Sequence, residues 1–137
     1  VALQMAEACR GGALVALLAD RGRAGEVLHA VPFLGAPAAF PVSPWLLAAS
    51  LKVPVLLCFG LYLGGNRYRL VFEPFATRVE LPRADRAAAL DGWIARYAGR
   101  LEHYARLAPY NWFNFHDFWQ DPGAAAGVGD RGRRGRG

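Results

Sequence analysis

The chain has 137 residues, of which 54% are apolar and 20% are charged, and its formal net charge is +5. That length and apolar content suffice for the core of one small domain, which excludes a wholly disordered chain. Residues 121–137 hold four arginines and two aspartates and so carry +2, which leaves a body that is only mildly basic at +3.

The first predicted elements are a short helix and a buried strand. Residues 2–10 place apolar side chains on one side of a helix that Gly11 and Gly12 would end. The run Ala13–Ala19 is continuously apolar, which is typical of a strand buried on both faces of a parallel sheet. Asp20 would then lie at the carboxyl end of that strand, the edge of an α/β sheet at which ligands bind.

A second strand, a turn, a helix and a third strand are predicted next. Residues 27–33 read as a short strand, and residues 33–35 as a turn. Ser43 is the predicted N-cap of a helix over 45–51, because a serine followed by Pro44 is a strong helix start. Residues 53–63 then form the next buried strand.

The second half of the chain predicts a hairpin and a long helix. Glycines and an asparagine at 64–66 indicate a turn, and residues 67–75 alternate between apolar and charged side chains. One antiparallel strand therefore joins the sheet. Apolar side chains recur at helical spacing over 84–106, which predicts an amphipathic helix packed on the sheet.

These elements together predict an α/β fold with a mostly parallel sheet flanked by helices. Residues 1–120 form the folded part, and the Gly/Ala/Arg tail at 121–137 is expected to be disordered because it has too little apolar content to fold. Cys9 and Cys58 are predicted to be buried free thiols of a reducing compartment, since neither has a CxxC spacing.

A membrane-spanning hairpin is the alternative interpretation of residues 36–66, which carry one charge, Lys52. Four prolines divide this stretch into pieces shorter than the ~20 residues that a spanning helix needs: Pro37, Pro41, Pro44 and Pro54. We therefore do not expect a spanning helix there.

Residues 13–57 resemble the second half of the bacterial lauroyl/myristoyl-type lipid acyltransferases, the branch of the lysophospholipid acyltransferase superfamily that acylates lipid A. The resemblance is carried by a strand ending in Asp20, a glycine-containing loop, and the turn V-P-F-L-G-A-P-A at 31–38 before a helix and another apolar strand. It extends more loosely from Leu3 to Trp119, with Glu102 on a long helix.

The aromatic segment at 110–119, YNWFNFHDFW, departs from the Trp, His and paired Arg usual in lipid A acyltransferases. It looks more like the relatives encoded with aryl-polyene pigment pathways, so the acceptor is left open. A non-catalytic module that binds membrane surfaces is the alternative function. Nucleic-acid binding is not expected, because the arginines of the tail lack a folded reading motif.

The resemblance implies an enzyme that moves a fatty acyl group from acyl carrier protein or coenzyme A to a lipid or glycolipid hydroxyl. It also implies the cytoplasmic face of the bacterial inner membrane, and neither a bound cofactor nor a metal. The family's catalytic His, with Asp or Glu five positions later, lies upstream of the block around Asp20. We therefore expect the catalytic residues upstream of Val1, in a longer enzyme of which this chain is the C-terminal part of the domain, inactive alone.

Acyl transfer also needs cations for phosphates and an apolar groove for the acyl chain. The resemblance assigns substrate binding to a charged rim and a turn, made by Asp20, Arg21, Arg23, Phe33 and Gly35. Two alternatives remain open. The charged residues could form a solvated salt bridge of little energetic weight, and Phe33 could be a core aromatic rather than part of the acyl path.

Two features of the C-terminal segment have competing interpretations. His116 is followed five positions later by Asp121, which repeats the spacing of the expected dyad, but chance accounts for such a pair at this composition. Five aromatic residues could anchor the chain at a membrane interface or, as we favour, pack into the core: Trp112, Phe113, Phe115, Phe118 and Trp119.

Overall fold

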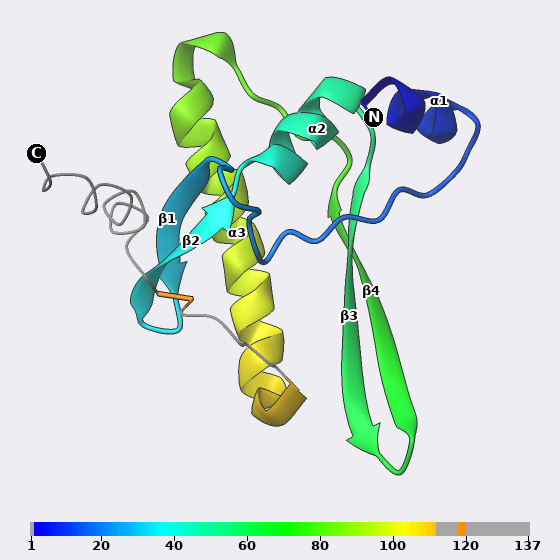
Figure 1. Ribbon diagram of the computed structural model, residues 1–137, viewed down its shortest axis with the longest axis vertical. Helices are drawn as coiled ribbons and strands as arrows, with labels where there is room; N and C mark the ends of the chain where they lie inside the picture. The colour runs from blue at the N-terminus through cyan, green and yellow to red at the C-terminus, as the bar shows by residue number, and fades with distance from the viewer. Residues whose placement is uncertain (1, 112–117, 120–137) are drawn as a thin grey trace, which may run out of the picture.

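The computed structural model describes residues 2–111 and 118–119. Its helices and strands follow one another in this order: α1 (Ala2–Arg10), β1 (Leu28–Phe33), β2 (Ala36–Pro41), α2 (Ser43–Leu51), β3 (Val55–Gly64), β4 (Arg67–Ala76) and α3 (Arg86–Leu107). Short 3₁₀ turns at Arg83–Asp85 and Pro109–Asn111 flank α3. The long helix α3 runs between a short hairpin, β1–β2, and a much longer one, β3–β4 (Figure 1).

The predicted mostly parallel sheet is wrong. In the part of the chain that the structure describes, the strands form two separate two-stranded antiparallel sheets, β1–β2 and β3–β4. The physical reason lies in the connections, because two residues join the strands of each hairpin, whereas a parallel pair needs a crossover of a dozen or more residues. The one helical crossover, through α2, joins β2 to β3, and these two strands do not pair.

The strand predicted over Ala13–Ala19 is also wrong. These residues lie in irregular chain between α1 and β1, and Leu14 and Leu18 are 91% and 73% exposed. A strand needs a neighbouring ladder to satisfy its backbone groups, and no described strand pairs with this run. Asp20 therefore does not follow a strand, and the argument that placed it at a sheet edge fails.

The first hairpin confirms the strand predicted over 27–33 and the turn after it. Leu34 and Gly35 both have positive φ, +50° and +87°, as a tight two-residue hairpin turn requires. Strand β2 was not predicted, because prolines argue against strands. Pro32 and Pro37 face each other one pair beyond the turn, at a position where no ladder hydrogen bond forms, so neither proline costs the sheet a bond.

Helix α2 confirms the predicted helix but not its cap. Val42 occupies the N-cap position without a side-chain cap, and Ser43 is the first helical residue. The Ser43 hydroxyl instead donates to the carboxylate of Glu26. Pro44 lies in the first turn as predicted, where its missing N–H has no intrahelical partner to lose.

Hairpin β3–β4 and helix α3 follow the sequence prediction closely. The strands pair in antiparallel register through a turn at Gly65 and Asn66, and α3 covers Arg86–Leu107 against the predicted 84–106.

The prediction of two buried thiols is wrong, since Cys58 is exposed and Cys9 is half-buried. Cys58 is exposed because it points to the side of β3 that α3 does not cover.

The core lies where α3, α2 and the first hairpin meet. Its largest fully buried side chains include Phe33 and Phe40 from the hairpin and Ile94 from α3. Trp45 of α2 packs against this cluster, and its ring centroid lies 5.4 Å from those of both Phe75 and Tyr97. Burial of these aromatic side chains is the main force that fixes β1–β2 on α3.

None of the helices within residues 2–111 combines the length and the apolar character that crossing a membrane would require. The predicted domain boundary at residue 120 and the tail at 121–137 lie outside the described residues and stay predictions.

Candidate functional site

The turn between β1 and β2 is held by side chains far away in the sequence. The Leu34 N–H donates to Glu102 Oε2 at 2.8 Å, and Arg106 Nε donates to Glu102 Oε1 at 2.9 Å. The indole N–H of Trp119 donates to the Phe33 carbonyl at 3.3 Å. We call these five residues the turn clamp. The Leu34 N–H, followed by Arg106, holds the pKa of the Glu102 carboxyl below its usual value.

Phe33 and Gly35, two of the predicted site residues, lie in or beside this turn. Phe33 is fully buried, with ring centroids 5.3 Å from Phe118 and 6.2 Å from a stacked Trp119. Its packing is that of a core aromatic, and a role in lining an acyl path stays a prediction. Gly35 shapes the turn through its φ of +87°, a conformation that residues with a Cβ adopt only with strain.

The predicted charged rim contains one close ion pair. Arg21 Nη2 and Nε lie 2.7 and 3.2 Å from Asp20 Oδ2. The Asp20 side chain is 17% exposed and that of Arg21 is 49% exposed, so Asp20 is the more enclosed partner. Hydrogen bonding to Asp20 raises the pKa of Arg21. Burial, and then the Asp20 charge, raise the pKa of Tyr97 on α3. Asp20 therefore lies close to α3 and orients Arg21.

Arg23 is attached differently, through its backbone. Its N–H donates to Glu26 Oε2 at 2.8 Å, while Glu26 Oε1 accepts from the Ser43 hydroxyl at the start of α2. These two donors, Ser43 first, lower the pKa of Glu26. The Arg23 guanidinium itself is exposed and has no ion pair within residues 2–111 and 118–119. Of the predicted site residues, it is the cation most available to an incoming phosphate.

A histidine and a carboxylate meet at a place that sequence reasoning missed. His29 Nδ1 of β1 lies 2.6 Å from Asp91 Oδ1 of α3, 62 positions away in the chain. Alternation along β1 places His29 on the same face as Val31, which was the signal available in the sequence. Because the Asp91 side chain is 56% exposed, we assign the pair to the attachment of β1 to α3, not to chemistry.

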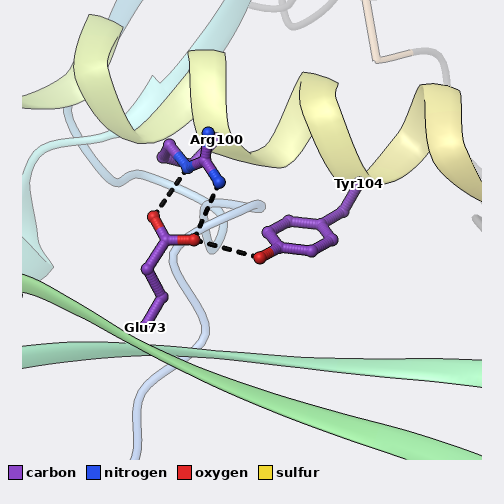
Figure 2. A network of polar contacts seen from close by, with 3 residues as sticks. All are labelled: Glu73, Arg100 and Tyr104. Carbon is purple, nitrogen blue, oxygen red and sulfur yellow. Dashed lines mark hydrogen bonds and ion pairs between the residues drawn. The ribbon is translucent and has the colours of Figure 1, made fainter.

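A second missed network attaches the long hairpin to α3. Figure 2 shows Arg100 and Tyr104, both on α3, turned toward the carboxylate of Glu73 on β4. Arg100 Nε and Nη2 lie 2.6 and 2.8 Å from the two Glu73 oxygens, and the Tyr104 hydroxyl donates at 3.0 Å. The bidentate contact with Arg100 is the main cause that lowers the pKa of Glu73.

The C-terminal predictions are only partly within the described residues. His116 and Asp121 lie outside them, as do Trp112, Phe113 and Phe115. Phe118 is 6% exposed and packs on Phe33 and Phe40, which is the core placement that the sequence favoured for it. Trp119 is 40% exposed and contributes to the turn clamp.

Comparison with protein families gives a match that covers most of the chain. The family model of the bacterial lipid A biosynthesis acyltransferases matches residues 3–121. This range contains the charged loop at residues 20–26, both hairpins, α3 and all of the turn clamp. Searches of curated proteins and of solved structures found no match. The resemblance seen in the sequence is thereby confirmed: this chain belongs to the bacterial lipid A biosynthesis acyltransferase family.

Proposed function

We propose that this chain holds the substrates of an acyltransferase that moves a fatty acyl group from acyl carrier protein or coenzyme A to a lipid or glycolipid hydroxyl. The reaction would take place at the cytoplasmic face of the bacterial inner membrane. The family match over residues 3–121 carries this proposal, because it includes every residue assigned to substrate binding. The donor, the acceptor and the membrane location are the proposed parts.

The charged loop would bind the phosphate of the donor. Both proposed donors carry phosphate next to the pantetheine arm, and a guanidinium matches phosphate oxygens in a bidentate fashion. Arg23 is exposed and available, and its loop is fixed to α2 by Glu26. Arg21 is already oriented by Asp20, so it would add charge at a fixed position beside Arg23.

The first hairpin would provide the apolar wall for the acyl chain. The turn clamp fixes Phe33 and Gly35 on α3, so a chain lying against this turn meets a rigid surface. Rigidity matters because acyl transfer depends on holding the thioester and the hydroxyl in one geometry. The alternative, a non-catalytic module for membrane surfaces, requires no binding of a thioester.

Titration of the purified chain with soluble acyl donors distinguishes these functions. Acyl-coenzyme A below its micelle concentration and acyl carrier protein carrying the same acyl group are added, and binding is followed by calorimetry. We expect saturable binding of at least one thioester, weakened roughly fivefold by Arg23→Ala, because an exposed ion pair contributes up to ~1 kcal/mol. Arg83→Ala, at an exposed arginine before α3, is the matched control and should leave binding unchanged. Binding of neither thioester would contradict the proposal.

A further inference from the structure

The long hairpin is apolar on both faces, and within residues 2–111 and 118–119 one of these faces is uncovered. Four cross-strand pairs, which we call the outer face, point away from α3: Leu56 with Pro74, Cys58 with Phe72, Gly60 with Leu70, and Tyr62 with Tyr68. All eight residues are exposed, and the larger ones are exposed by 46% to 68%. Strands with apolar residues on both sides are typical of sheets that are covered on both faces.

The inner face of the same hairpin is already occupied by α3. Phe59 stacks on Tyr104 with ring centroids 4.2 Å apart, and Leu57 and Leu61 are buried. Glu73 accepts hydrogen bonds from two side chains of α3 (Figure 2). Because α3 satisfies only the inner face, the apolar residues of the outer face are not explained by the fold of the described chain.

The charges of the hairpin lie on the opposite side from the outer face. Its strands carry three charged residues, Arg67, Arg69 and Glu73, and the alternation of β4 places all three on the side that faces α3. The outer face therefore has no formal charge. Two such faces can meet without burying a charge or opposing like charges, whereas an ionic partner would find no complementary group there.

An uncharged apolar face is complementary to a second copy of itself. A two-fold interface requires this property, because both copies contribute the same residues. Two sheets packed face to face lie about 10 Å apart, which lets the side chains of the two faces interdigitate. Each long hairpin would then be covered on both sides, by its own α3 and by the hairpin of the other copy.

The size of the outer face suffices for a specific dimer. Large apolar residues offer on the order of 200 Å² each when fully exposed, so the exposed parts of the eight residues amount to roughly 600–700 Å². Two faces in contact would bury about 1,200–1,400 Å² in total, which exceeds the ~1,000 Å² that a specific interface needs.

A lipid surface fits the outer face less well. In the described chain both edges of this two-stranded hairpin have unpaired backbone groups, which are costly inside hydrocarbon. Arg67 and Arg69 are on the other side of β4, so they would not face lipid phosphates if the outer face lay on a bilayer. Contact with a second copy leaves the strand edges and these arginines in water.

We propose that the outer faces of two copies of this chain pack against each other and form a symmetric dimer through β3–β4. Because α3 lies between the two hairpins, the first hairpin of each copy stays outside the interface (Figure 1). The inference goes beyond the proposed function and does not depend on it.

Sedimentation equilibrium of the purified chain over a range of concentrations tests the dimer. We expect the mass of two chains at about 100 µM and dissociation on dilution, since interfaces of this size reach at least micromolar affinity. Phe72→Glu should weaken the dimer roughly hundredfold or more, because contact would bury two unpaired carboxylates. The matched control, Leu14→Glu, adds the same charge at an exposed leucine outside the hairpin and should change dimerisation less than threefold. Circular dichroism confirms that both variants fold.

Crosslinking through Cys58 locates the interface. In a Cys9→Ser background Cys58 is the only thiol, and it belongs to one of the two central pairs of the outer face. A two-fold axis through the centre of the face therefore brings the two Cys58 side chains close together. A short bismaleimide should link two copies, and Phe72→Glu should abolish the linked product. A chain whose single thiol is moved by Cys58→Ser and Leu14→Cys is the control and should not be linked.

Three results would overturn the inference. The first is a monomer at every concentration, or larger aggregates without a dimer. The second is a dimer that Phe72→Glu weakens no more than Leu14→Glu does, which would place the interface elsewhere. The third is a monomer that sediments with lipid vesicles unless Phe72→Glu is present, which would indicate that lipid covers the outer face. Phe72→Glu should leave the titration with soluble thioesters unchanged, so the inference and the proposed function can fail separately.

Discussion

The role of the Asp20–Arg21 ion pair in substrate binding can be measured separately from its contribution to folding stability. Arg21 is half-exposed and adjacent in sequence to Asp20, so the pair contributes little to folding. Arg21 is two residues from the exposed Arg23 in the same loop, which suits the proposed binding of phosphate instead.

We therefore expect Asp20→Ala and Arg21→Ala each to cost less than about 1 kcal/mol in the free energy of unfolding. The affinity for acyl donors, and activity in the full enzyme, should fall further, roughly fivefold, because the phosphate loses an oriented cation. Urea denaturation and thioester titration measure the two effects. Proportional losses in both would support the solvated salt bridge that the sequence left open.

Three glutamates link distant parts of the chain and have a pKa lowered by their donors. Glu73 is held by Arg100, Glu102 by the Leu34 N–H and Glu26 by the Ser43 hydroxyl. A carboxyl whose pKa is lower in the folded state than in the unfolded chain stabilises the fold above its unfolded value, about 4.3 for glutamate. That contribution disappears as the pH falls through the folded pKa.

The contribution of these carboxyls to the free energy of unfolding should therefore be constant between pH 5 and 7. It should decrease below about pH 4.3. Glu73→Gln should lower stability at pH 6 and reduce the loss on acidification, because one of the three linked groups no longer titrates. Denaturation midpoints at pH 6 and pH 3.5 measure both. An unchanged acid dependence in Glu73→Gln would show that Glu73 is not ion-paired in solution.

At the scale of elements, the turn of the first hairpin determines where the proposed site residues Phe33 and Gly35 lie. Gly35 has a φ of +87° and open space around its Cα, so strain, not crowding, opposes a side chain there. Gly99, on the exposed side of α3, also has open space, but it lies in a helix where alanine is favoured.

Gly35→Ala should lower the free energy of unfolding by about 1–2 kcal/mol, the cost of a left-handed conformation for a residue with a Cβ. Gly99→Ala, the matched control, should raise it by about 0.5–1 kcal/mol. Thermal and urea denaturation measure both changes. A neutral Gly35→Ala would mean that the turn relaxes, and with it the contact of Leu34 to Glu102.

The elements that the sequence predicted correctly are those whose signal is local. Apolar spacing of 3.6 residues revealed α3, and alternation with a glycine-rich turn revealed β3–β4. The strand over Ala13–Ala19 failed because an apolar run does not say whether a partner strand is present. Strand β2 was missed for a different reason, because Pro37 is tolerated at a strand pair that needs no hydrogen bond.

The candidate site, like the fold, was predicted from the sequence only in part. Local motif residues such as Asp20, Arg23 and Gly35 could be selected from the resemblance, and the clamp residue Glu102 matched the family pattern. Its contact with Leu34 spans 68 positions, and that between His29 and Asp91 spans 62. Such pairings depend on how α3 packs on β1, which no local pattern in a single sequence specifies.

At the scale of the whole molecule, helix α3 lies between the two hairpins (Figure 1). In the proposed function, the acyl donor binds to the first hairpin and the charged loop, and the second hairpin does not contact it. Helix α3 joins them, since the turn clamp, His29 and Glu73 all contact it. The proposed function therefore predicts that an acyl donor contacts the charged loop and the first hairpin but not β3–β4.

The most direct measurement is photocrosslinking with a coenzyme A thioester whose acyl chain carries a diazirine, followed by peptide mapping. We expect saturable labelling within residues 20–35, competed by unmodified acyl thioester and reduced in Arg23→Ala. Labelling confined to β3–β4, or labelling that no thioester competes, would contradict the proposal that this chain holds the donor at its charged loop and first hairpin.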